Sequence, residues 1–476
     1  MVRDVLLGIN HVVLVYFIVI VSSYSAVTLL SWVQVRRYFR RLVHARLKRS
    51  VRSALTPPIS ICVPAYNEAS VIVDSVRSML ALRYAEHEVV LTNDGSTDDT
   101  LALLAEAFDM HRVDQPQHPR LPTQRVRGVW RSRTHSGLVV IDKENGGRAD
   151  ALNCSINFAN YPLVCCVDAD SLLEREALLT VVRPFIERPD RTIGAGGIIR
   201  VANGCEITRG HVTAVGLPRK VLPMFQTVEY LRAFTAARTG WSMVNGLLII
   251  SGAFGLFRKD AVIDVGGFAA DSIGEDFELC MRLHKRMRDL KRPYHLAFVP
   301  DPVCWTQAPD RLGQLGGQRD RWHRGLTDTL IRHRRMIGNP RYGVVGLLSL
   351  PFFVAFEFFG AFLELVGYIA VPLAFGLGYL NLMGALAFFA LAVLAGICLS
   401  LSALLLEDMA FRRFVQWRDF LRLVSFSMLE NFGYRQLMTV YRVRGFWSYL
   451  RGNHSWGHID RTGFTTDGLQ PDVGGH

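Results

Sequence analysis

The sequence predicts an α/β fold in which a mostly parallel sheet is preceded and followed along the chain by apolar helices. Three observations predict this fold. Short β-rich apolar runs alternate with segments of helical spacing between residues 56 and 335. One apolar run precedes this region and a longer one follows it. Half of the 476 residues are hydrophobic, and the mean hydropathy of +0.19 is high for a soluble protein.

The order of these segments predicts four regions. Residues 1–55 are expected to form a membrane-spanning helix and a basic linker, and residues 56–335 a cytoplasmic globular domain. Residues 336–441 are expected to form interfacial and membrane-spanning helices. Residues 442–476 are expected to be a C-terminal tail.

Strands and helices are expected to alternate through the first half of the globular domain. Such alternation is typical of a parallel sheet, in which ligands bind beyond the carboxyl ends of the strands. The segment from Asp114 to Arg133 is rich in Pro, Arg and Gln and is expected to be a surface loop. The expected elements are strand 59–64, helix 69–82, strand 88–92, helix 98–108, strand 138–142, helix 147–158 and strand 163–167.

The first apolar run, from His11 to Val33, is long enough to span a bilayer. A positive cluster from Arg36 to Arg52 follows this run, whereas the positive charges of a signal peptide come first. The run is therefore predicted to be an anchor, with the positive cluster in the cytoplasm.

The second apolar region extends from residue 342 to residue 406. Its first part, residues 343–356, is expected to lie along the membrane surface. Residues 359–380 and 382–406 are each expected to span the membrane. Residues 420–441 carry several charges, which favours an interfacial amphipathic helix; a fourth span lining a polar path is the alternative.

A carboxylate, Glu364, falls inside one of the predicted spans. Charged groups at this depth are costly and face a protein neighbour or a polar cavity. Glu364 is therefore expected either to bond a neighbouring helix or to line a path for a hydrophilic product.

Composition argues against several classes of function. The net charge is +12, from 54 Lys+Arg and 42 Asp+Glu, but no zinc finger, RNA-binding signature or helix-turn-helix accompanies it, so nucleic acid is not expected as a partner. Much of the positive charge flanks apolar segments, which suits anionic lipid headgroups. The eight cysteines show no CxxC spacing and are expected to be reduced core residues rather than zinc ligands or disulfides.

Two carboxylates in the sequence VDADS follow the strand expected at 163–167. Asp168 and Asp170 are two residues apart, so both point to one face while the strand geometry lasts. Two oxygen ligands on one side suit Mg²⁺ or Mn²⁺, with substrate phosphates completing the coordination. An Asp-rich turn without a metal is the structural alternative.

Two further strand ends carry residues suited to a nucleotide. Tyr66 is positioned to cover a base, Glu68 to accept ribose hydroxyls and Asp94, in NDGS, to read a base NH. Lys143 and Arg148 flank two glycines at a helix start, where cations and backbone NH groups suit phosphate. Taken alone, each of these is also explained by a strand-to-helix turn or a helix cap.

The sequence GEDFE opens a helix expected at 277–287. Asp276 is the candidate general base, because sugar transfer to a neutral hydroxyl needs a proton acceptor within hydrogen-bonding range. Glu275 and Phe254 are expected to contact the acceptor, Phe254 from a small, glycine-rich segment. Acidic residues at a helix start are also explained by the helix dipole alone.

The sequence QRDRW places Gln318, Arg321 and Trp322 on one helix face, at spacing i, i+3 and i+4. Arginine is a planar fork for phosphate oxygens, and Trp offers a flat wall for a sugar ring. A surface helix that packs its Trp against lipid headgroups is the alternative.

The four motifs in this order resemble those of the membrane-embedded family 2 glycosyltransferases, which include cellulose, chitin, hyaluronan and poly-N-acetylglucosamine synthases. The resemblance covers residues 58–322 and extends loosely into the later apolar part. It implies a GT-A fold, a UDP-sugar donor, Mg²⁺ or Mn²⁺, and inversion at the anomeric carbon. It also implies residue roles: Tyr66, Glu68 and Asp94 for the uridine, Asp168 and Asp170 for donor and metal, Asp276 as base, Gln318 and Arg321 for the diphosphate, and Trp322 for the acceptor.

The chain departs from the family pattern in two places. Asn93 stands where many relatives have a first Asp, although Asp94 remains. Near the end, the segment from Ser455 to Arg461 resembles the gating loop of the polymerising synthases, through Trp456 and Gly457. Its basic residue, Arg461, comes later than in the family, and a disordered basic tail is the alternative.

The resemblance predicts a transferase that extends a polysaccharide on the cytoplasmic side of the bacterial inner membrane and passes it through its own helices. The expected partners are a UDP-sugar, a polysaccharide or lipid-linked acceptor, membrane lipids, and an accessory export or regulatory subunit. One alternative is a non-processive transferase that adds a single sugar to a lipid carrier. The other is a catalytically inactive binding or assembly subunit, which the full set of motif residues disfavours. The motifs do not assign the sugar.

Overall fold

The computed structural model describes residues 2–44, 56–114, 119–208, 210–379, 382–411 and 417–452. The expected gating residues Trp456 and Arg461 lie outside these ranges, as does most of the basic linker after residue 44. The prediction of a gating loop therefore stays a prediction.

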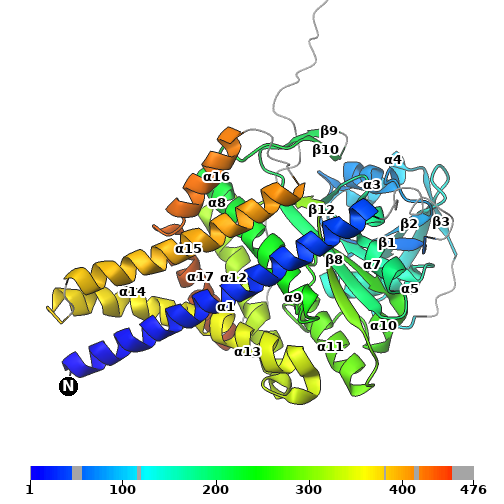
Figure 1. Cartoon of the computed structure of the whole chain (residues 1–476). Helices are drawn as coiled ribbons and strands as arrows, with labels where there is room; N and C mark the ends of the chain where they lie inside the picture. The colour runs from blue at the N-terminus through cyan, green and yellow to red at the C-terminus, as the bar shows by residue number, and fades with distance from the viewer. Residues whose placement is uncertain are drawn as a thin grey trace, which may run out of the picture.

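A ten-stranded sheet lies on one side of the molecule, and long helices extend from it toward the other side (Figure 1). Its strand order is β3-β4-β5-β2-β1-β6-β11-β8-β12-β7, and a separate pair joins β9 to β10. Neighbours run in parallel from β5 through β2 and β1 to β6, and again between β8 and β12. The strands are β1 Ile59–Ala65, β2 His87–Asn93, β3 Met110–Val113, β4 Val126–Ser132, β5 Leu138–Lys143, β6 Leu163–Val167, β7 Leu172–Leu173, β8 Thr192–Val201, β9 Glu206–Thr208, β10 His211–Ala214, β11 Phe254–Arg258 and β12 His295–Thr306.

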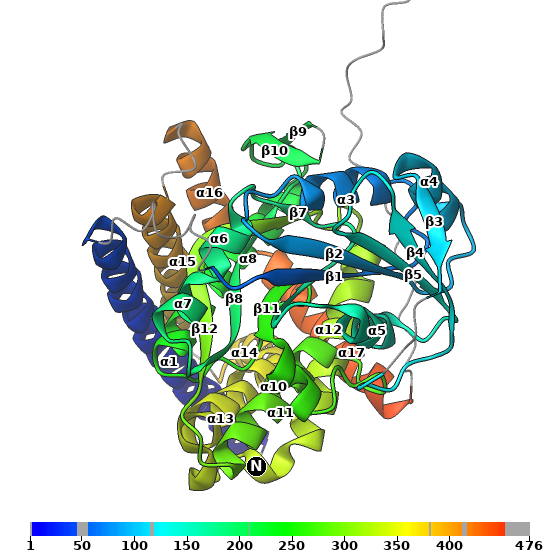
Figure 2. The same ribbon diagram turned by 90° about the vertical axis from the view of Figure 1, so that its right-hand side faces the viewer.

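Helices cover both faces of this sheet, with α3 and α5 on opposite sides of β1 and β2 (Figure 2). The helices of the sheet domain are α3 Ile72–Leu80, α4 Thr100–Ala107, α5 Arg148–Phe158, α6 Ala177–Val181, α7 Arg183–Glu187, α8 Val221–Tyr230, η1 Leu231–Arg238, α9 Thr239–Met243, α10 Lys259–Asp264, α11 Glu275–Asp289, α12 Leu312–Arg332, η2 Arg334–Met336 and η3 Pro340–Tyr342. The predicted α/β fold is confirmed, and each expected strand is found within two residues of its predicted ends.

The core follows from the apolar runs that predicted the strands. Every residue of β6 is buried, as is nearly every residue of β1 and β2. Burial on both faces is typical of strands in a parallel sheet with helices on each side. All eight cysteines are free, and Cys62, Cys165 and Cys166 lie in this core as expected.

The carboxyl ends of the parallel strands meet at one edge of the sheet. In register, Ala65 of β1 lies beside Asn93 of β2, which lies beside Asp142 of β5. On the other side of β1, Cys62 pairs with Cys166, so β6 ends at the same edge. The motif residues that follow these strands are therefore brought together by the strand register.

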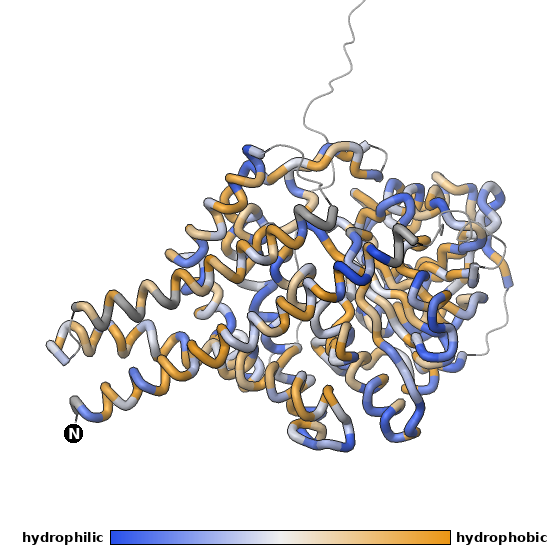
Figure 3. The backbone as a smooth tube through the Cα atoms, in the orientation of Figure 1, coloured by the Kyte–Doolittle hydropathy of each residue, from blue (hydrophilic) through white to orange (hydrophobic). Residues whose placement is uncertain are grey.

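Long apolar helices extend from one side of the sheet domain. They are α1 Val2–His44, η4 Val345–Ser349, α13 Leu350–Phe352, η5 Phe353–Phe358, α14 Gly360–Gly376 and α15 Leu382–Phe411, and they are followed by α16 Trp417–Leu429 and α17 Tyr434–Leu450. Helices α1, α14 and α15 project away from the sheet together (Figure 1), and their outer parts are strongly hydrophobic (Figure 3). Among the described residues, two helices are long and apolar enough to cross a membrane, Asp4–Arg40 and Val345–Gly376.

Four expectations need correction. The expected loop from Asp114 to Arg133 contains β4, which pairs with β3 and β5. The chain is helical without a break from Val345 to Gly376, so the described structure shows no separate surface helix before α14. Residues 420–441 form parts of two helices, α16 and α17, because Gly433 with φ +100° turns the chain between them. The tail expected from residue 442 begins as the second half of α17.

Helix α1 docks on the sheet domain through a close backbone contact. A Cβ added to Gly240 of α9 would lie 2.3 Å from the backbone oxygen of Val27. Beside this contact, the Ser31 hydroxyl donates hydrogen bonds to the carbonyl oxygens of Ala236, at 2.5 Å, and Thr235, at 3.2 Å. Both carbonyls belong to η1, a π-helical stretch, and π-helical turns occur frequently at functional sites.

The Gly240 contact predicts the effect of a single methyl group. Gly240→Ala is expected to lower the free energy of unfolding by about 1–3 kcal/mol, because the new Cβ meets backbone that cannot rotate away. Thermal unfolding of the protein in detergent measures this loss. The control is Gly313→Ala, where no atom lies within 4 Å of the added Cβ and stability should be unchanged or slightly higher. Equal melting temperatures for the two variants would contradict the prediction.

Candidate active site

The Asp94 carboxylate lies at the end of β2 and is held from three directions. Its Oδ1 accepts hydrogen bonds from Lys143 Nζ and, at 3.0 Å, from the Gly146 backbone NH. Its Oδ2 accepts one at 2.8 Å from the Gly147 backbone NH. Asp94 is buried, and these contacts fix the loop after β5 against the end of β2. The expected contact of Asp94 with a base stays a prediction.

Lys143 has a different setting from the one expected of a phosphate ligand. Its side chain is fully buried, and besides Asp94 its Nζ contacts Asp150 Oδ1 at 2.6 Å and the Glu144 carbonyl oxygen at 2.7 Å. These acceptors use the three donors of the ammonium group. In this structure Lys143 therefore holds Asp94 and the start of α5, and it does not present its charge to a ligand.

The segment after β1 presents one accessible ring. Tyr66 is 44 % exposed, so its ring is available to a flat ligand, whereas Glu68 is buried. Asn67 between them has φ +56°, a left-handed conformation that Asn tolerates, and its side-chain oxygen accepts a hydrogen bond from the Thr97 backbone NH at 2.8 Å. These contacts connect the turn after β1 to the NDGS segment after β2.

Arg148 at the start of α5 joins three distant segments. Its Nε donates to Asp168 Oδ1 at 2.8 Å, its Nη1 to Glu275 Oε1 at 2.5 Å and its Nη2 to the Gly252 carbonyl oxygen at 2.7 Å. Burial acts to lower the pKa of Arg148, but Asp168 and Glu275 outweigh burial and raise the pKa above its ordinary value. A guanidinium is the side chain best suited to bridge carboxylates in this way.

This bridge was not expected from the sequence, which suggested a phosphate contact for Arg148. Its partners lie 20, 104 and 127 residues further along the chain, so no local pattern signals them. The bridge brings the VDADS and GEDFE motifs into one cluster. An arrangement with these motifs on separate surfaces, which would have contradicted a shared site, is thereby excluded.

Asp276 is oriented by two backbone donors. Its Oδ2 accepts a hydrogen bond from the Gly252 NH at 3.0 Å, and its Oδ1 accepts one from the Phe277 NH at 2.8 Å. The side chain is half-buried at the start of α11, where the helix dipole also favours a negative charge. A carboxylate fixed in this way retains lone pairs for a further hydrogen bond.

Two residues expected to contact an acceptor are buried. Glu275 is 4 % exposed and is engaged by Arg148, while burial and the neighbouring Asp276 raise its pKa against the opposing effect of Arg148. Phe254 is fully buried in the core and pairs with Val167 of β6. The expectation is corrected for both residues. Glu275 holds Arg148, and Phe254 is a core residue of strand β11.

Helices α11 and α12 cross at two glycines. A Cβ added to Gly274 would lie 3.1 Å from Gly325 Cα, and a Cβ on Gly325 would lie 3.0 Å from Gly274 Cα. Asp276 is two residues beyond Gly274, and Arg321 is one helical turn before Gly325. This contact therefore places the candidate base beside the helix of the QRDRW motif.

The QRDRW residues present three different groups on α12. Gln318 has a buried Oε1 with no hydrogen-bond partner in the described chain, Arg321 is half-buried, and Trp322 is 46 % exposed. The Arg319 guanidinium stacks on the Trp322 ring at 4.3 Å and forms an ion pair with Glu229 at 2.9 Å. The Trp322 ring is thus held in place while part of it stays accessible.

Asp168 and Asp170, the expected metal ligands, suit a metal site in which a bound substrate supplies further ligands. Asp168 has 29 % of its side chain exposed and gives one oxygen to Arg148, and Asp170 is half-buried. Within the described ranges, no group of three or more His, Cys, Asp or Glu residues is arranged to hold a metal. Mg²⁺ is commonly bound by one or two carboxylates together with substrate phosphates and water, which is what this pair can offer.

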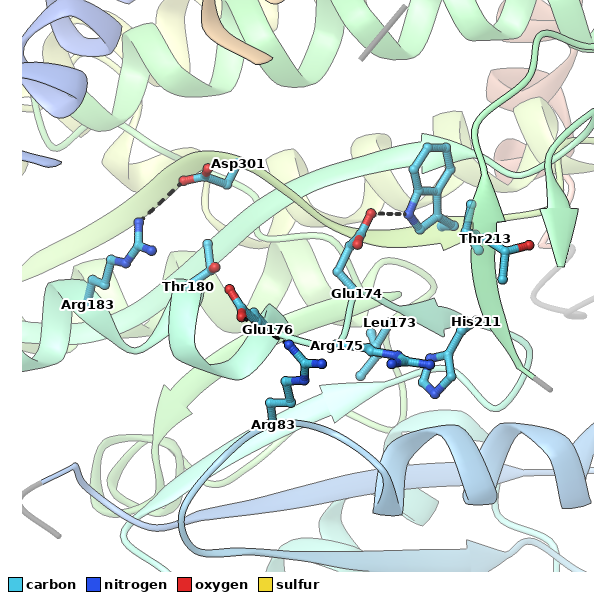
Figure 4. A pocket seen from close by; sticks show the side chains of 12 residues that line it. Arg83, Leu173, Glu174, Arg175, Glu176, Thr180, Arg183, His211, Thr213 and Asp301 are labelled. Atoms are coloured by element: carbon cyan, nitrogen blue, oxygen red, sulfur yellow. Dashed lines mark hydrogen bonds and ion pairs between the residues drawn. The ribbon is translucent and has the colours of Figure 1, made fainter. Parts of the chain in front are cut away.

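A separate cavity of about 510 Å³ lies beside β7 and β10 (Figure 4). Arg183 and Asp301 face each other across part of it at 3.8 Å, and Glu174 accepts a hydrogen bond from the Trp305 ring NH at 2.9 Å. None of the described residues that line it belongs to the four motifs. The cavity is therefore distinct from the site built around Arg148.

Comparisons with known proteins agree with this geometry. The family model described as Glycosyltransferase like family 2 matches residues 57–325. The poly-beta-1,6-N-acetyl-D-glucosamine synthase of Staphylococcus aureus (strain COL) is 30% identical over 276 residues, which are 58% of this chain and 56% of that protein. The corresponding synthase of Staphylococcus epidermidis is 30% identical over 275 residues, with the same coverage. The chain thus matches about half the length of these curated relatives.

A solved structure shows the same fold. The mannosyltransferase PcManGT from Pyrobaculum calidifontis, in complex with GDP-Man and Mn²⁺, matches with a TM-score of 0.52 at 18% sequence identity. The match covers 93% of this chain and 100% of that one. The expected GT-A type of fold is confirmed.

The glycine crossing of α11 and α12 predicts an effect on turnover. Gly325→Ala is expected to lower kcat/KM about tenfold or more, because the added Cβ meets the Gly274 backbone and shifts the start of α11, which carries Asp276, relative to α12. The control on the same helix is Gly317→Ala, which meets no atom within 4 Å. Steady-state rates and melting temperatures of both variants provide the measurement. Unchanged kcat/KM for Gly325→Ala would show that the crossing does not position the site.

Proposed function

Because the chain belongs to glycosyltransferase family 2, we propose that it is an inverting, metal-dependent enzyme that transfers sugar from a UDP-sugar to a growing polysaccharide. The observation that most directly supports this proposal is the Arg148 bridge from Asp168 to Glu275, the neighbour of Asp276. The bridge gathers the carboxylates proposed for the donor and the carboxylate proposed for the acceptor into one site.

The proposed reaction is a single displacement. The oxygen of an acceptor hydroxyl attacks the anomeric carbon, and its proton passes to the Asp276 carboxylate. The bond between the anomeric carbon and the diphosphate oxygen breaks, and the electron pair leaves with UDP. One displacement inverts the configuration at that carbon. The backbone donors of Gly252 and Phe277 orient Asp276 for the proton, as general base catalysis requires.

The diphosphate carries the negative charge that the site must balance. Asp168 and Asp170 would hold Mg²⁺ or Mn²⁺, which when bound supplies charge neutralisation for the departing UDP. Arg321 and Gln318 on α12 are proposed as diphosphate contacts, since an arginine fork suits phosphate oxygens and the Gln318 Oε1 has no partner in the described chain. Tyr66, Glu68 and Asp94 are proposed for the uridine, and Trp322 for the acceptor sugar.

The relatives indicate which donor to test first. Those compared above are named as poly-beta-1,6-N-acetyl-D-glucosamine synthases, so UDP-N-acetylglucosamine is the first choice. Purified protein in detergent would be incubated with a panel of UDP-sugars and Mg²⁺ or Mn²⁺. Released UDP identifies the donor, and gel mobility of the product reports its length. A single added sugar on a lipid would favour the non-processive alternative.

We further propose that the apolar helices place the enzyme in a membrane and line a path for the product. A row of polar side chains lies between these helices. The Tyr24 hydroxyl of α1 donates to Glu357 Oε1 at 2.5 Å, and Arg442 of α17 forms an ion pair with Glu357 at 3.3 Å. The Thr439 hydroxyl of α17 donates to Glu364 Oε2 of α14 at 2.8 Å.

A second polar cluster joins Arg232 of η1 to Ser400 of α15 and Arg435 of α17 through Glu430. Glu430 is fully buried and accepts hydrogen bonds from Arg232 at 2.5 Å, Ser400 at 3.0 Å and Arg435 at 3.1 Å. Polar groups in a bundle of apolar helices are costly and mark hydrophilic pathways. The two clusters together support a path from the Trp322 helix into the bundle.

The base assignment predicts a specific kinetic defect. Asp276→Asn is expected to lower kcat by about 10²–10⁴-fold while leaving UDP affinity unchanged, because the amide keeps the shape but accepts no proton. Rates of UDP release and calorimetric UDP titration measure the two quantities. The control is Asp264→Asn, which removes a surface carboxylate paired with Arg286. Turnover of Asp276→Asn equal to that of the control would refute the assignment.

The proposed path predicts an effect on product length. Arg442→Met is expected to shorten the polymer while the first transfer proceeds at its normal rate, because the variant leaves Glu357 without its cation inside the bundle. Gel analysis of the product and single-turnover UDP release separate these effects. The control is Arg451→Met at the exposed end of the same helix. Polymer of full length from Arg442→Met would contradict the path.

A further inference from the structure

The cavity beside β7 and β10 is a polar site that the reaction described above does not use (Figure 4). Its volume of about 510 Å³ lies within the range of about 300–1,000 Å³ that is typical of small-molecule sites. Its lining includes four basic side chains, those of Arg83, Arg175, Arg183 and His211. The ligand that suits the cavity depends on which lining groups the protein leaves without a partner.

Two carboxylates of the cavity are engaged by the protein itself. Asp301 of β12 accepts a hydrogen bond from the Tyr38 hydroxyl of α1 and lies 3.8 Å from Arg183. Glu174 accepts a hydrogen bond from the Trp305 ring NH at 2.9 Å. No group of acidic side chains in the described part of the chain is arranged to hold a metal. The cavity is therefore not suited to a metal cation.

The arginines of the cavity, in contrast, have NH groups without partners. Arg83 and Glu176 pair at 3.7 Å, but both side chains are more than half exposed, so the pair is weak. Arg175 forms no ion pair or side-chain hydrogen bond with any residue in the described ranges. Arg183 donates from Nη1 to the Tyr38 hydroxyl at 2.5 Å, but its buried Nε has no partner there. Free guanidinium donors of this kind suit an anion.

A buried imidazole is a second, independent indication of a ligand. His211 of β10 is 9 % exposed and lines the cavity, yet its Nδ1 is buried and has no hydrogen-bond partner among the described residues. Burial and the neighbouring Arg175 lower the pKa of His211, so its ring is neutral at pH 7. A buried ring nitrogen without a hydrogen bond is costly, and a polar ligand would remove this cost. His211 lies beside Arg175 in Figure 4, so one ligand can contact both side chains.

We propose that this cavity binds a soluble, phosphate-bearing small molecule that also carries hydroxyl groups, such as a sugar phosphate. The guanidinium groups of Arg175 and Arg183 suit the phosphate oxygens. His211 and the hydroxyls of Thr180 and Thr213 line the same cavity and suit the hydroxyl groups of the ligand. This site is separate from the proposed donor site and does not depend on the proposed function.

The place of the cavity in the fold favours a soluble ligand over a lipid headgroup. Strand β10, which forms part of its wall, lies with the sheet domain and far from the outer ends of α1, α14 and α15 (Figure 1). Those outer ends are the strongly hydrophobic parts of the molecule (Figure 3). A headgroup in a bilayer around them would not reach β10.

The test is calorimetric titration of the full chain in detergent with glucose 6-phosphate, with and without UDP and Mg²⁺. Saturable binding is expected in both conditions. Arg175→Met is expected to weaken it about tenfold or more, because a charged hydrogen bond to the phosphate is lost. The matched control is Arg191→Met, which removes another exposed arginine that does not line the cavity and should bind like the wild type. Both variants should keep the wild-type melting temperature.

Three results would overturn the proposal. The first is no binding of glucose 6-phosphate to the wild type at millimolar concentration, or equal affinity in Arg175→Met. The second is loss of binding whenever UDP and Mg²⁺ are present, which would place the probe in the donor site. The third comes from titration with a short-chain phosphatidylglycerol. Tighter binding of this lipid than of glucose 6-phosphate, lost in Arg175→Met, would assign the cavity to a lipid headgroup and refute a soluble ligand.

Discussion

The site depends on one guanidinium. Arg148 contacts Asp168 after β6, Glu275 at the start of α11 and the carbonyl of Gly252 before β11, and no other described residue bonds all three segments. Glu275 and Arg148 are largely shielded from water, so each needs the other to offset the cost of burying its charge. Loss of Arg148 leaves the buried charge of Glu275 without its ion-pair partner. The geometry of the site and the stability of this part of the fold therefore share the same contacts.

The second constraint on the structure is that two pairs of helices pass with their backbones in contact. Gly274 and Gly325 allow α11 and α12 to cross with no side chain between them, and Gly240 allows α1 to lie against α9. Helix α17 then packs along α12, where Ser448 donates to Asp320 at 2.8 Å. The helix that carries Trp322 is consequently held by the sheet domain on one side and by the apolar helices on the other. A sugar chain held at Trp322 would lie where these two parts meet.

The sequence predicted those features that depend on local pattern. Buried strands with a polar residue at their ends can be predicted from alternation and spacing, so the positions of Asp94 and Asp168 at one edge of the sheet followed from the parallel order. The partners that a side chain contacts from distant parts of the sequence could not be predicted. Lys143 carries the charge of a phosphate ligand but is buried against Asp94 and Asp150, and Phe254 lies in a flexible-looking segment that is in fact a core strand.

The apolar helices also make polar contacts with the sheet domain. A π-helical stretch such as η1 satisfies its carbonyls less regularly than an α-helix, and here Ser31 of α1 bonds two of them. On the same stretch, Thr235 bonds Glu407, which also pairs with Arg200 of β8. Excision of the apolar helices would leave carbonyls of η1 and the guanidinium of Arg200 without these partners. Since unsatisfied buried polar groups are costly, η1 would shift to find water or other partners. The sheet domain is thus tied by buried polar contacts to helices whose outer surfaces are apolar.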